Sequence, residues 1–337
     1  MEQQYDVVVV GGGAAGLGGA LALSRARRSV LVLDAGRPRN APAGQVHNYL
    51  AREGTAPGEL LAIGRAEVAG YGAHLESGEA VAAAPDGDGF VVDLADGRRV
   101  RARRLLVTTG LVDELPEVPG VAELWGTDVL HCPYCHGWEV RDQPVGVLST
   151  SPFGVLQAQM WRQWTADVTL FLHTGPEPSD DEREALAARG ISVVTGEVAG
   201  LETDGGRLSG VRLASGQVVP RTALVVLSRF TARSAVLESL GLAAVDQEMG
   251  GQVLGRVVPS GPAGATTVPG VWVAGNVTDP RAQVVVSAAA GLEAAAALNA
   301  DLIAEDTRLA VAAHRASPSP AGAGPRDLVP GGRRHGN

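Results

Sequence analysis

A glycine-rich turn near the start of the chain constrains the fold more than any other feature. Residues 5–10, YDVVVV, form a continuous run of mostly β-branched residues, which is typical of a buried parallel strand. A predicted helix follows at about residues 14–27, and a second apolar run covers residues 30–33. Three glycines join the first strand to the helix in the spacing GxGxxG: Gly11, Gly13 and Gly16. The order strand, helix, strand predicts a right-handed βαβ unit.

The same turn predicts a bound dinucleotide. Glycines let the backbone approach a pyrophosphate, and the helix that begins at Ala14 and Ala15 offers unpaired N–H groups and the positive end of its dipole. Asp34 ends the second strand, where a carboxylate accepts hydrogen bonds from ribose hydroxyls. The alternative is a turn that only packs the helix on the strand. The motif by itself leaves FAD and NAD both open.

The strand and helix pattern starts again at Pro144, with PVGVLST, a helix, VTLFLH, an acidic helix and ISVVT. An Ala-rich helix at about residues 283–304 needs a sheet to pack on and completes the first domain, which is then discontinuous. The predicted parts are a first portion of the cofactor domain (1–115), an inserted domain (116–242), the second portion of the first domain (243–314) and a disordered tail (315–337).

Bulk properties exclude several classes of protein. The chain has 337 residues, enough for two domains, and its net charge of −9 argues against a nucleic-acid partner. We expect no apolar run long enough to span a bilayer, and a strand begins almost at the N-terminus. We therefore expect a cytoplasmic protein without membrane association. Only two cysteines are present, so a disulfide framework is excluded.

Those two cysteines, Cys132 and Cys135, form a CxxC motif followed by His136. Zinc would need further ligands, and His131 and His136 are crowded onto the same loop. A c-type haem site shares the CxxCH pattern but belongs to exported proteins. Beside a nucleotide-binding fold, close thiols that cycle to a disulfide are the favoured interpretation, with no metal, and His136 is the natural proton carrier.

Together with the turn and the CxxC, three more segments resemble the two-domain flavoprotein disulfide reductases of the thioredoxin reductase type. They are LLVTTG, Gly44-Gln45 with Asn48, and VWVAGNVTDPRAQVVVSAAAG. The resemblance implies an α/β fold with a discontinuous, Rossmann-like FAD-binding domain and an inserted, smaller NAD(P)-binding-like domain that carries the CxxC. It implies FAD as cofactor, a homodimer, and further cofactor-binding residues: Gln45, Asn48, Val81, Gly110, Gly275, Asn276, Gln283 and Val284.

Within that family, HCPYCHGWE resembles the dithiol oxidases that close disulfides in microbial natural products such as gliotoxin and holomycin, because thioredoxin reductases typically have Asp where this chain has His136. The inserted domain departs from the reductases as well. Its first turn, LSTSPFG, is poor in glycine, and EPSDDERE brings carboxylates where a phosphate clamp is expected.

The resemblance implies a reaction in which Cys132 exchanges with a small dithiol, Cys135 faces the flavin, and oxygen takes the electrons to give hydrogen peroxide. Three alternatives stay open. They are an NAD(P)H-dependent disulfide reductase, a flavoprotein that exchanges electrons with ferredoxin or another protein, and a flavin-bound redox sensor without turnover.

Overall fold

The computed structural model describes residues 4–316, in two compact units: residues 4–298 and residues 299–316. The first unit holds every strand of the described residues. The second is the continuation of helix α7 (Val284–Ala316) from Asn299.

Seven strands form the first sheet, in the order β3-β2-β1-β6-β5-β4, with β19 beside the end of β6. The strands are β1 (Gln4–Val10), β2 (Val30–Asp34), β3 (His74–Ser77), β4 (Ala80–Asp86), β5 (Gly89–Leu94), β6 (Arg99–Val107) and β19 (Val271–Val273). Helix α1 (Ala14–Arg25) connects β1 to β2, which pair in parallel, and α2 (Pro57–Gly70) leads to β3. The predicted βαβ unit is therefore confirmed.

A second sheet is parallel throughout, in the order β11-β10-β9-β15-β8. Its strands are β8 (Val129–Leu130), β9 (Val145–Leu148), β10 (Val168–Phe171), β11 (Ser192–Val194) and β15 (Ala223–Val226). Helix α3 (Pro133–His136) follows β8, while α4 (Phe153–Trp161) and α5 (Asp180–Ala188) connect β9, β10 and β11. The repeated pattern that the sequence predicts from Pro144 is present in this order.

Side chains that alternate along these strands build two cores. On one face, Trp161 and Leu186 from the helices pack with Val147 and Leu170. On the other face, a three-stranded antiparallel sheet packs with Phe171 and neighbouring side chains. Its strands are β12 (Val198–Asp204), β13 (Arg207–Leu213) and β14 (Val218–Pro220). The second sheet is covered on both faces, as all-parallel sheets require.

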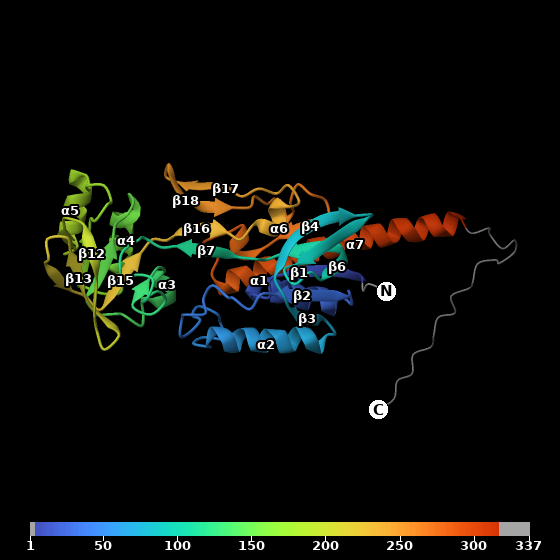
Figure 1. The fold of residues 1–337 in the computed structure, drawn as a ribbon, viewed down its shortest axis with the longest axis horizontal. Helices are drawn as coiled ribbons and strands as arrows, with labels where there is room; N and C mark the ends of the chain where they lie inside the picture. The colour runs from blue at the N-terminus through green and yellow to red at the C-terminus, as the bar shows by residue number, and fades with distance from the viewer. Residues whose placement is uncertain (1–3, 317–337) are drawn as a thin grey trace, which may run out of the picture. The chain divides into compact units, whose positions relative to one another are not determined.

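A fourth sheet, in the order β17-β18-β16-β7, joins the two α/β regions. Strands β7 (Leu111–Glu114) and β16 (Arg229–Ala232) pair in antiparallel fashion (Figure 1), so the chain enters and leaves the second region along adjacent strands. The other members are β17 (Val245–Met249) and β18 (Gln252–Val257). Short helical segments complete the unit: α6 (Ala235–Glu238), η1 (Pro262–Gly264) and η2 (Gly275–Val277).

Within the first unit, α7 packs closely against α1. A Cβ atom on Gly291 would overlap the carbonyl oxygen of Ala15, and one on Gly18 would press on that of Ala288. Small residues thus bring the two helix backbones together. The Ala-rich helix that the sequence places at residues 283–304 is present but continues to Ala316.

By length and composition, α7 is also apolar enough to span a membrane, so the expectation that no segment reaches that length was wrong. The many alanines of α7 make the helix apolar on average, although few of its side chains are large and apolar. Core helices of globular proteins pass the same test, and Ala294 and Leu298 of α7 are fully buried in the first unit.

The predicted domain boundaries remain predictions. The boundary after residue 115 falls just beyond β7, and the one after residue 242 falls between α6 and β17. Of the predicted tail, residues 315 and 316 belong to α7, and residues 317–337 lie outside the described residues.

Candidate active site

The turn between β1 and α1 is shaped by glycine at two positions. Gly11 has φ +106°, and a Cβ atom there would overlap the carbonyl oxygen of Thr108, whose hydroxyl donates to the carbonyl oxygen of Gly11 at 2.8 Å. A Cβ atom on Gly16 would overlap that same Gly11 oxygen. Gly13, by contrast, has no neighbour within 4 Å of its ideal Cβ position. The turn therefore packs tightly against the sheet and stays open on its outer side.

Asp34 lies at the carboxyl end of β2, beside this turn. Its Oδ2 accepts a hydrogen bond from Arg65 Nη2 at 2.6 Å, which leaves Oδ1 for a ligand hydroxyl. The first N–H groups of α1 are capped by no side chain, because Gly13 is the N-cap residue. Unpaired N–H groups at a helix start, together with a carboxylate at the next strand end, fit a dinucleotide.

The turn opens into a cavity of about 1300 Å³, larger than the usual range of about 300–1,000 Å³ for small-ligand pockets. Most of the predicted site residues line it: Gly11, Gly13, Ala14, Ala15, Asp34, Gln45, Gly110, Cys132, Cys135, His136, Gly275, Asn276, Gln283 and Val284. The cavity brings together segments from the beginning, middle and end of the first unit.

Three predicted residues do not line the cavity. Gly16 is buried behind the turn, where it lets α1 approach Gly11. Val81 lies on β4 with 42% of its surface exposed, while its neighbours Glu79 and Ala80 line the cavity. Asn48 points its amide at the CxxC segment instead, donating from Nδ2 to the carbonyl oxygen of Tyr134 at 2.7 Å.

Cys132 and Cys135 form a disulfide at the wall of this cavity, with their Cα atoms 5.2 Å apart. Cys132 is the N-cap residue of α3, and Pro133 starts the helix, where its missing N–H costs nothing. The amide of Cys135 donates to the carbonyl oxygen of Cys132 at 3.1 Å. Among residues 4–316, no group of three or more His, Cys, Asp or Glu side chains is arranged to hold a metal ion.

Two histidines flank the disulfide in sequence, and both line the cavity. Burial lowers the pKa of His136, opposed by the nearby charge of Glu139 and reinforced by His47. Burial also lowers the pKa of His131, with a further contribution from Arg39. A neutral imidazole accepts a proton, so His136 is suited to take one from a thiol at neutral pH.

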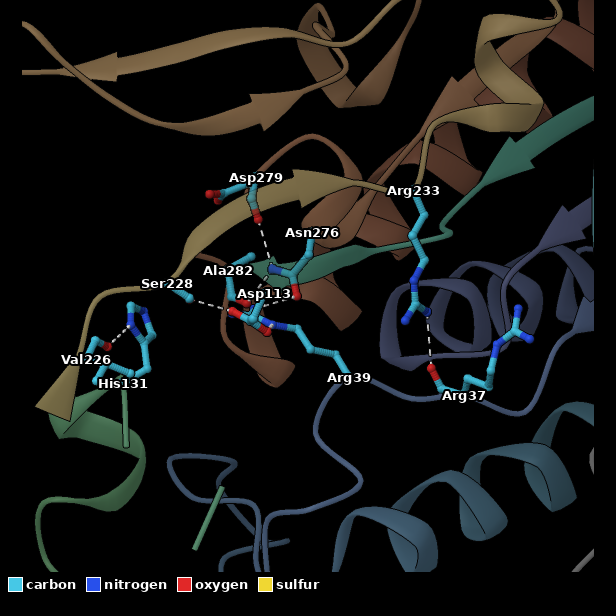
Figure 2. A network of polar contacts seen from close by, with 10 residues as sticks. All are labelled: Arg37, Arg39, Asp113, His131, Val226, Ser228, Arg233, Asn276, Asp279 and Ala282. Carbon is cyan, nitrogen blue, oxygen red and sulfur yellow. Dashed lines mark hydrogen bonds and ion pairs between the residues drawn. The ribbon is translucent and has the colours of Figure 1, made fainter. Parts of the chain in front are cut away.

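Sequence reasoning missed a partly buried polar network centred on Arg39 (Figure 2). Arg39 makes two hydrogen bonds to Asp113, at 2.6 and 2.7 Å, and Asp113 also accepts from the hydroxyl of Ser228 at 2.7 Å. The network holds the pKa of Asp113 below its ordinary value despite burial. No local sequence signal marks it, because its members lie far apart in the chain.

The same arginine also contacts Asn276, one of the residues predicted to bind the cofactor. Arg39 Nη1 donates to Asn276 Oδ1 at 3.4 Å, and Asn276 Nδ2 donates to the carbonyl oxygens of Asp279 and Ala282, both at 2.9 Å (Figure 2). The amide oxygen of Asn276 therefore faces Arg39, and its nitrogen faces the two carbonyl oxygens. Arg39 and Asn276 both line the cavity, so this network forms part of its wall.

The corresponding turn of the second α/β region, after β9, is closed. Ser149 is 3% exposed, and its hydroxyl donates to the carbonyl oxygen of Ser151 at 3.1 Å. A Cβ atom on Gly154 or on Gly175 would overlap the Ser149 side chain. Ser149 thus fills the space between the start of α4 and the segment after β10. The residues at 149–151 after β9 are serine, threonine and serine, whereas three glycines follow β1 at 11–13.

Comparison with known proteins agrees with this architecture. The sequence profile of the family described as pyridine nucleotide-disulphide oxidoreductase matches residues 5–294. The chain belongs to this family. It is therefore a thiol-disulfide oxidoreductase enzyme with a flavin cofactor.

Individual relatives place the chain more narrowly. It is 32% identical to thioredoxin reductase tcpT of Claviceps purpurea (strain 20.1) over 80% of this chain and 86% of that protein. It is 29% identical to thioredoxin reductase sirT of Leptosphaeria maculans over 90% and 95%. The crystal structure of HlmI superposes with a TM-score of 0.85 at 47% identity, covering 92% of this chain and 96% of that one. The predicted fold and the predicted resemblance to thioredoxin reductase-like flavoproteins are thus confirmed.

Proposed function

We propose that this enzyme is an FAD-dependent dithiol oxidase that closes a disulfide in a small-molecule dithiol, with oxygen as electron acceptor. One observation carries the proposal. The Cys132–Cys135 disulfide shares a single cavity with the glycine turn after β1, whereas the turn after β9 is filled by Ser149. The cavity thus places a redox disulfide beside a dinucleotide-type turn, and the second turn has side chains where a pyridine nucleotide donor favours the bare backbone of glycine.

The proposed reaction balances two electrons and two protons. One substrate thiolate attacks the enzyme disulfide at Cys132 and releases Cys135 as a thiolate. The second substrate thiol then attacks the mixed disulfide, which frees Cys132 and leaves the substrate oxidised. A bound FAD would supply the two-electron acceptor for the enzyme dithiol and the route from it to oxygen, so the net change is dithiol plus oxygen to disulfide plus hydrogen peroxide.

The residues of the cavity have separate tasks in this proposal. His136 takes the proton of the attacking thiol, because its lowered pKa keeps the ring neutral at neutral pH. Gly11, Gly13 and the start of α1 would hold the pyrophosphate, and Asp34 the ribose. The first turn of α7, at Gln283 and Val284, contributes N–H groups and the positive end of a helix dipole.

The substrate class comes from the resemblance rather than from the cavity. The likeness to natural-product dithiol oxidases is based on the HCPYCHGWE segment of this chain. Its relatives tcpT and sirT carry the name thioredoxin reductase, which keeps an NAD(P)H-dependent disulfide reductase as the second candidate. A reductase runs the same cysteines in the opposite direction and needs a pyridine nucleotide donor.

An anaerobic reduction experiment separates the two candidates. Excess NADPH or NADH should leave the flavin of the purified protein oxidised, while a small dithiol should bleach it. Readmitted air should restore the yellow colour with release of hydrogen peroxide. Rapid bleaching by NADPH would support the reductase instead, and a bleached flavin that persists in air would indicate a protein acceptor such as ferredoxin.

A homodimer and a cytoplasmic location complete the proposal. Support for the dimer comes from the family resemblance and from large apolar side chains that α7 exposes in the first unit, with Val285 at 36% and Leu292 at 53% exposed. Light scattering on the purified flavoprotein should give twice the mass of one chain.

A further inference from the structure

The loop of residues 46–55, which we call the clasp loop, is closed at its base. Val46 and Thr55 form an isolated bridge, in which the Val46 amide donates to the Thr55 carbonyl oxygen at 2.8 Å. The amide of Gly54 also donates to the carbonyl oxygen of Val46, at 2.9 Å. The two ends of the clasp loop therefore lie side by side, and the loop is compact.

Two side chains of the clasp loop reach across to the segment that carries the cysteines. Asn48 Nδ2 donates to the carbonyl oxygen of Tyr134 at 2.7 Å, between the two cysteines. His47 Nε2 lies 3.3 Å from Glu139 Oε1, four residues beyond Cys135. The two contacts bracket Cys135 and the histidine that follows it.

A single carboxylate organises both of these side chains. Glu53 Oε1 lies 2.5 Å from His47 Nδ1, and Glu53 Oε2 accepts from the backbone amide of Asn48 at 2.8 Å. Asn48 has φ +60°, a left-handed conformation that asparagine adopts more readily than most residues. His47 therefore has a carboxylate oxygen near each of its ring nitrogens.

The cysteine segment has little internal stability of its own. Helix α3 has four residues and no side-chain N-cap, and isolated helical turns are unstable in water. On one side it packs against Trp164, whose ring lies edge-on to Tyr134 at 5.4 Å and limits the space at Gly137. The clasp loop supplies polar contacts to the same segment.

We propose that Asn48 and His47 are positioning residues, which hold the segment 132–139 so that Cys135 and His136 keep a fixed place in the cavity. The inference deepens the proposed function, because Cys135 is the sulfur that passes electrons to the cofactor. Transfer between groups in a site is sensitive to misplacement, and a shift of about 1 Å can cost about 10²-fold in rate. Attack by a substrate thiol on Cys132 depends less on the clasp.

Asn48→Asp is the sharpest variant. It keeps the size and the tolerance for φ +60°, but it replaces the N–H donor that faces the Tyr134 carbonyl with an oxygen. Amide hydrogen exchange across residues 132–139 should become about five- to tenfold faster, the scale of one lost hydrogen bond. Electron transfer from the reduced cysteines to the flavin should slow about tenfold or more, while mixed-disulfide formation with a small thiol stays within about twofold.

The contact between His47 and Glu139 is tested by a conservative rescue. Glu139→Ala removes the acceptor that faces His47, whereas Glu139→Gln keeps an oxygen there. Exchange in segment 132–139 should therefore rise in Glu139→Ala and return most of the way to the wild-type rate in Glu139→Gln. Arg52→Ala, an exposed change in the same loop, should match the wild-type protein in every measurement.

Each outcome decides the proposal. Wild-type exchange in Asn48→Asp would overturn it, and so would faster exchange with unchanged electron transfer. Loss of bound flavin with unchanged exchange would also overturn it and support the cofactor-binding role that the sequence predicts for Asn48. The exchange measurement needs no substrate, so a wild-type protein that fails to oxidise dithiols would refute the proposed function while the clasp is still tested.

Discussion

The two α/β regions of this enzyme share one plan and differ in what their first turn contains. After β1, the turn is lined by glycine, and Gly13 faces open space. After β9, the same strand–turn–helix arrangement is filled by the buried side chain of Ser149. The difference teaches that a shared strand–turn–helix plan does not by itself give two regions the same function, because the residues of the turn decide what can approach its backbone.

The second region contributes the cysteine pair, which lines the same cavity as the glycine turn of the first region. One region therefore provides the cofactor turn and the other the redox chemistry. Four predictions test this division.

The largest effect is expected from the cysteines. Cys132→Ser and Cys135→Ser should each lower dithiol oxidation by more than about 10³-fold, because thiol-disulfide exchange needs both sulfurs. Bound flavin, read from its visible absorbance, should be retained in both variants, since the turn after β1 lies in the other region. Activity near the wild-type level in either variant would remove the second region from the chemistry.

His136→Ala should slow flavin reduction by a dithiol by about 10²–10⁴-fold, the usual range for a general base. Burial lowers the pKa of His136 below its ordinary value of about 6.5, so the ring stays neutral at neutral pH and accepts a proton there. The ratio of the wild-type rate to the variant rate cancels the ionisation of the substrate. It should be constant above about pH 6.5 and fall at lower pH, where the ring becomes protonated. A ratio near one at every pH would exclude His136.

Gly13→Val tests the open turn. A Cβ atom on Gly13 would have no protein atom within 4 Å, and the φ of −79° suits any residue, so we expect the circular dichroism spectrum to be unchanged. The side chain would occupy space beside the first N–H groups of α1, and flavin affinity should fall at least about tenfold, or about 1.4 kcal/mol. Unchanged affinity in a titration of the apoprotein would show that the cofactor does not approach this turn.

The smallest effect is expected in the closed turn. Ser149→Gly should change dithiol oxidation by less than about twofold and cost about 1 kcal/mol of unfolding free energy through added backbone freedom. NADPH should still fail to bleach the flavin, because the acidic segment after β10 is unchanged. Bleaching by NADPH in this variant alone would show that Ser149 is the main barrier to the nucleotide.

The sequence by itself determined the repeated strand–helix pattern, the glycine turn and the redox pair, because each of these depends on residues close together in the chain. It was less reliable at helix ends, since α7 continues to Ala316 where a shorter helix was predicted. Most of the site residues that the family resemblance implies lie together along one cavity, and their roles stay predictions.

Only the tertiary structure showed what Arg39, Asp113, Ser149 and Asn48 contact. Arg39 and Asp113 are separated by 74 residues, and Asn48 and Tyr134 by 86, so no local pattern relates them. Hydrogen bonds of this kind depend on where the folded backbone brings two side chains, which spacing in the sequence does not encode. For the same reason, the sequence showed only that the turn after β9 is poor in glycine. The structure showed that Ser149 fills the space beside Gly154 and Gly175.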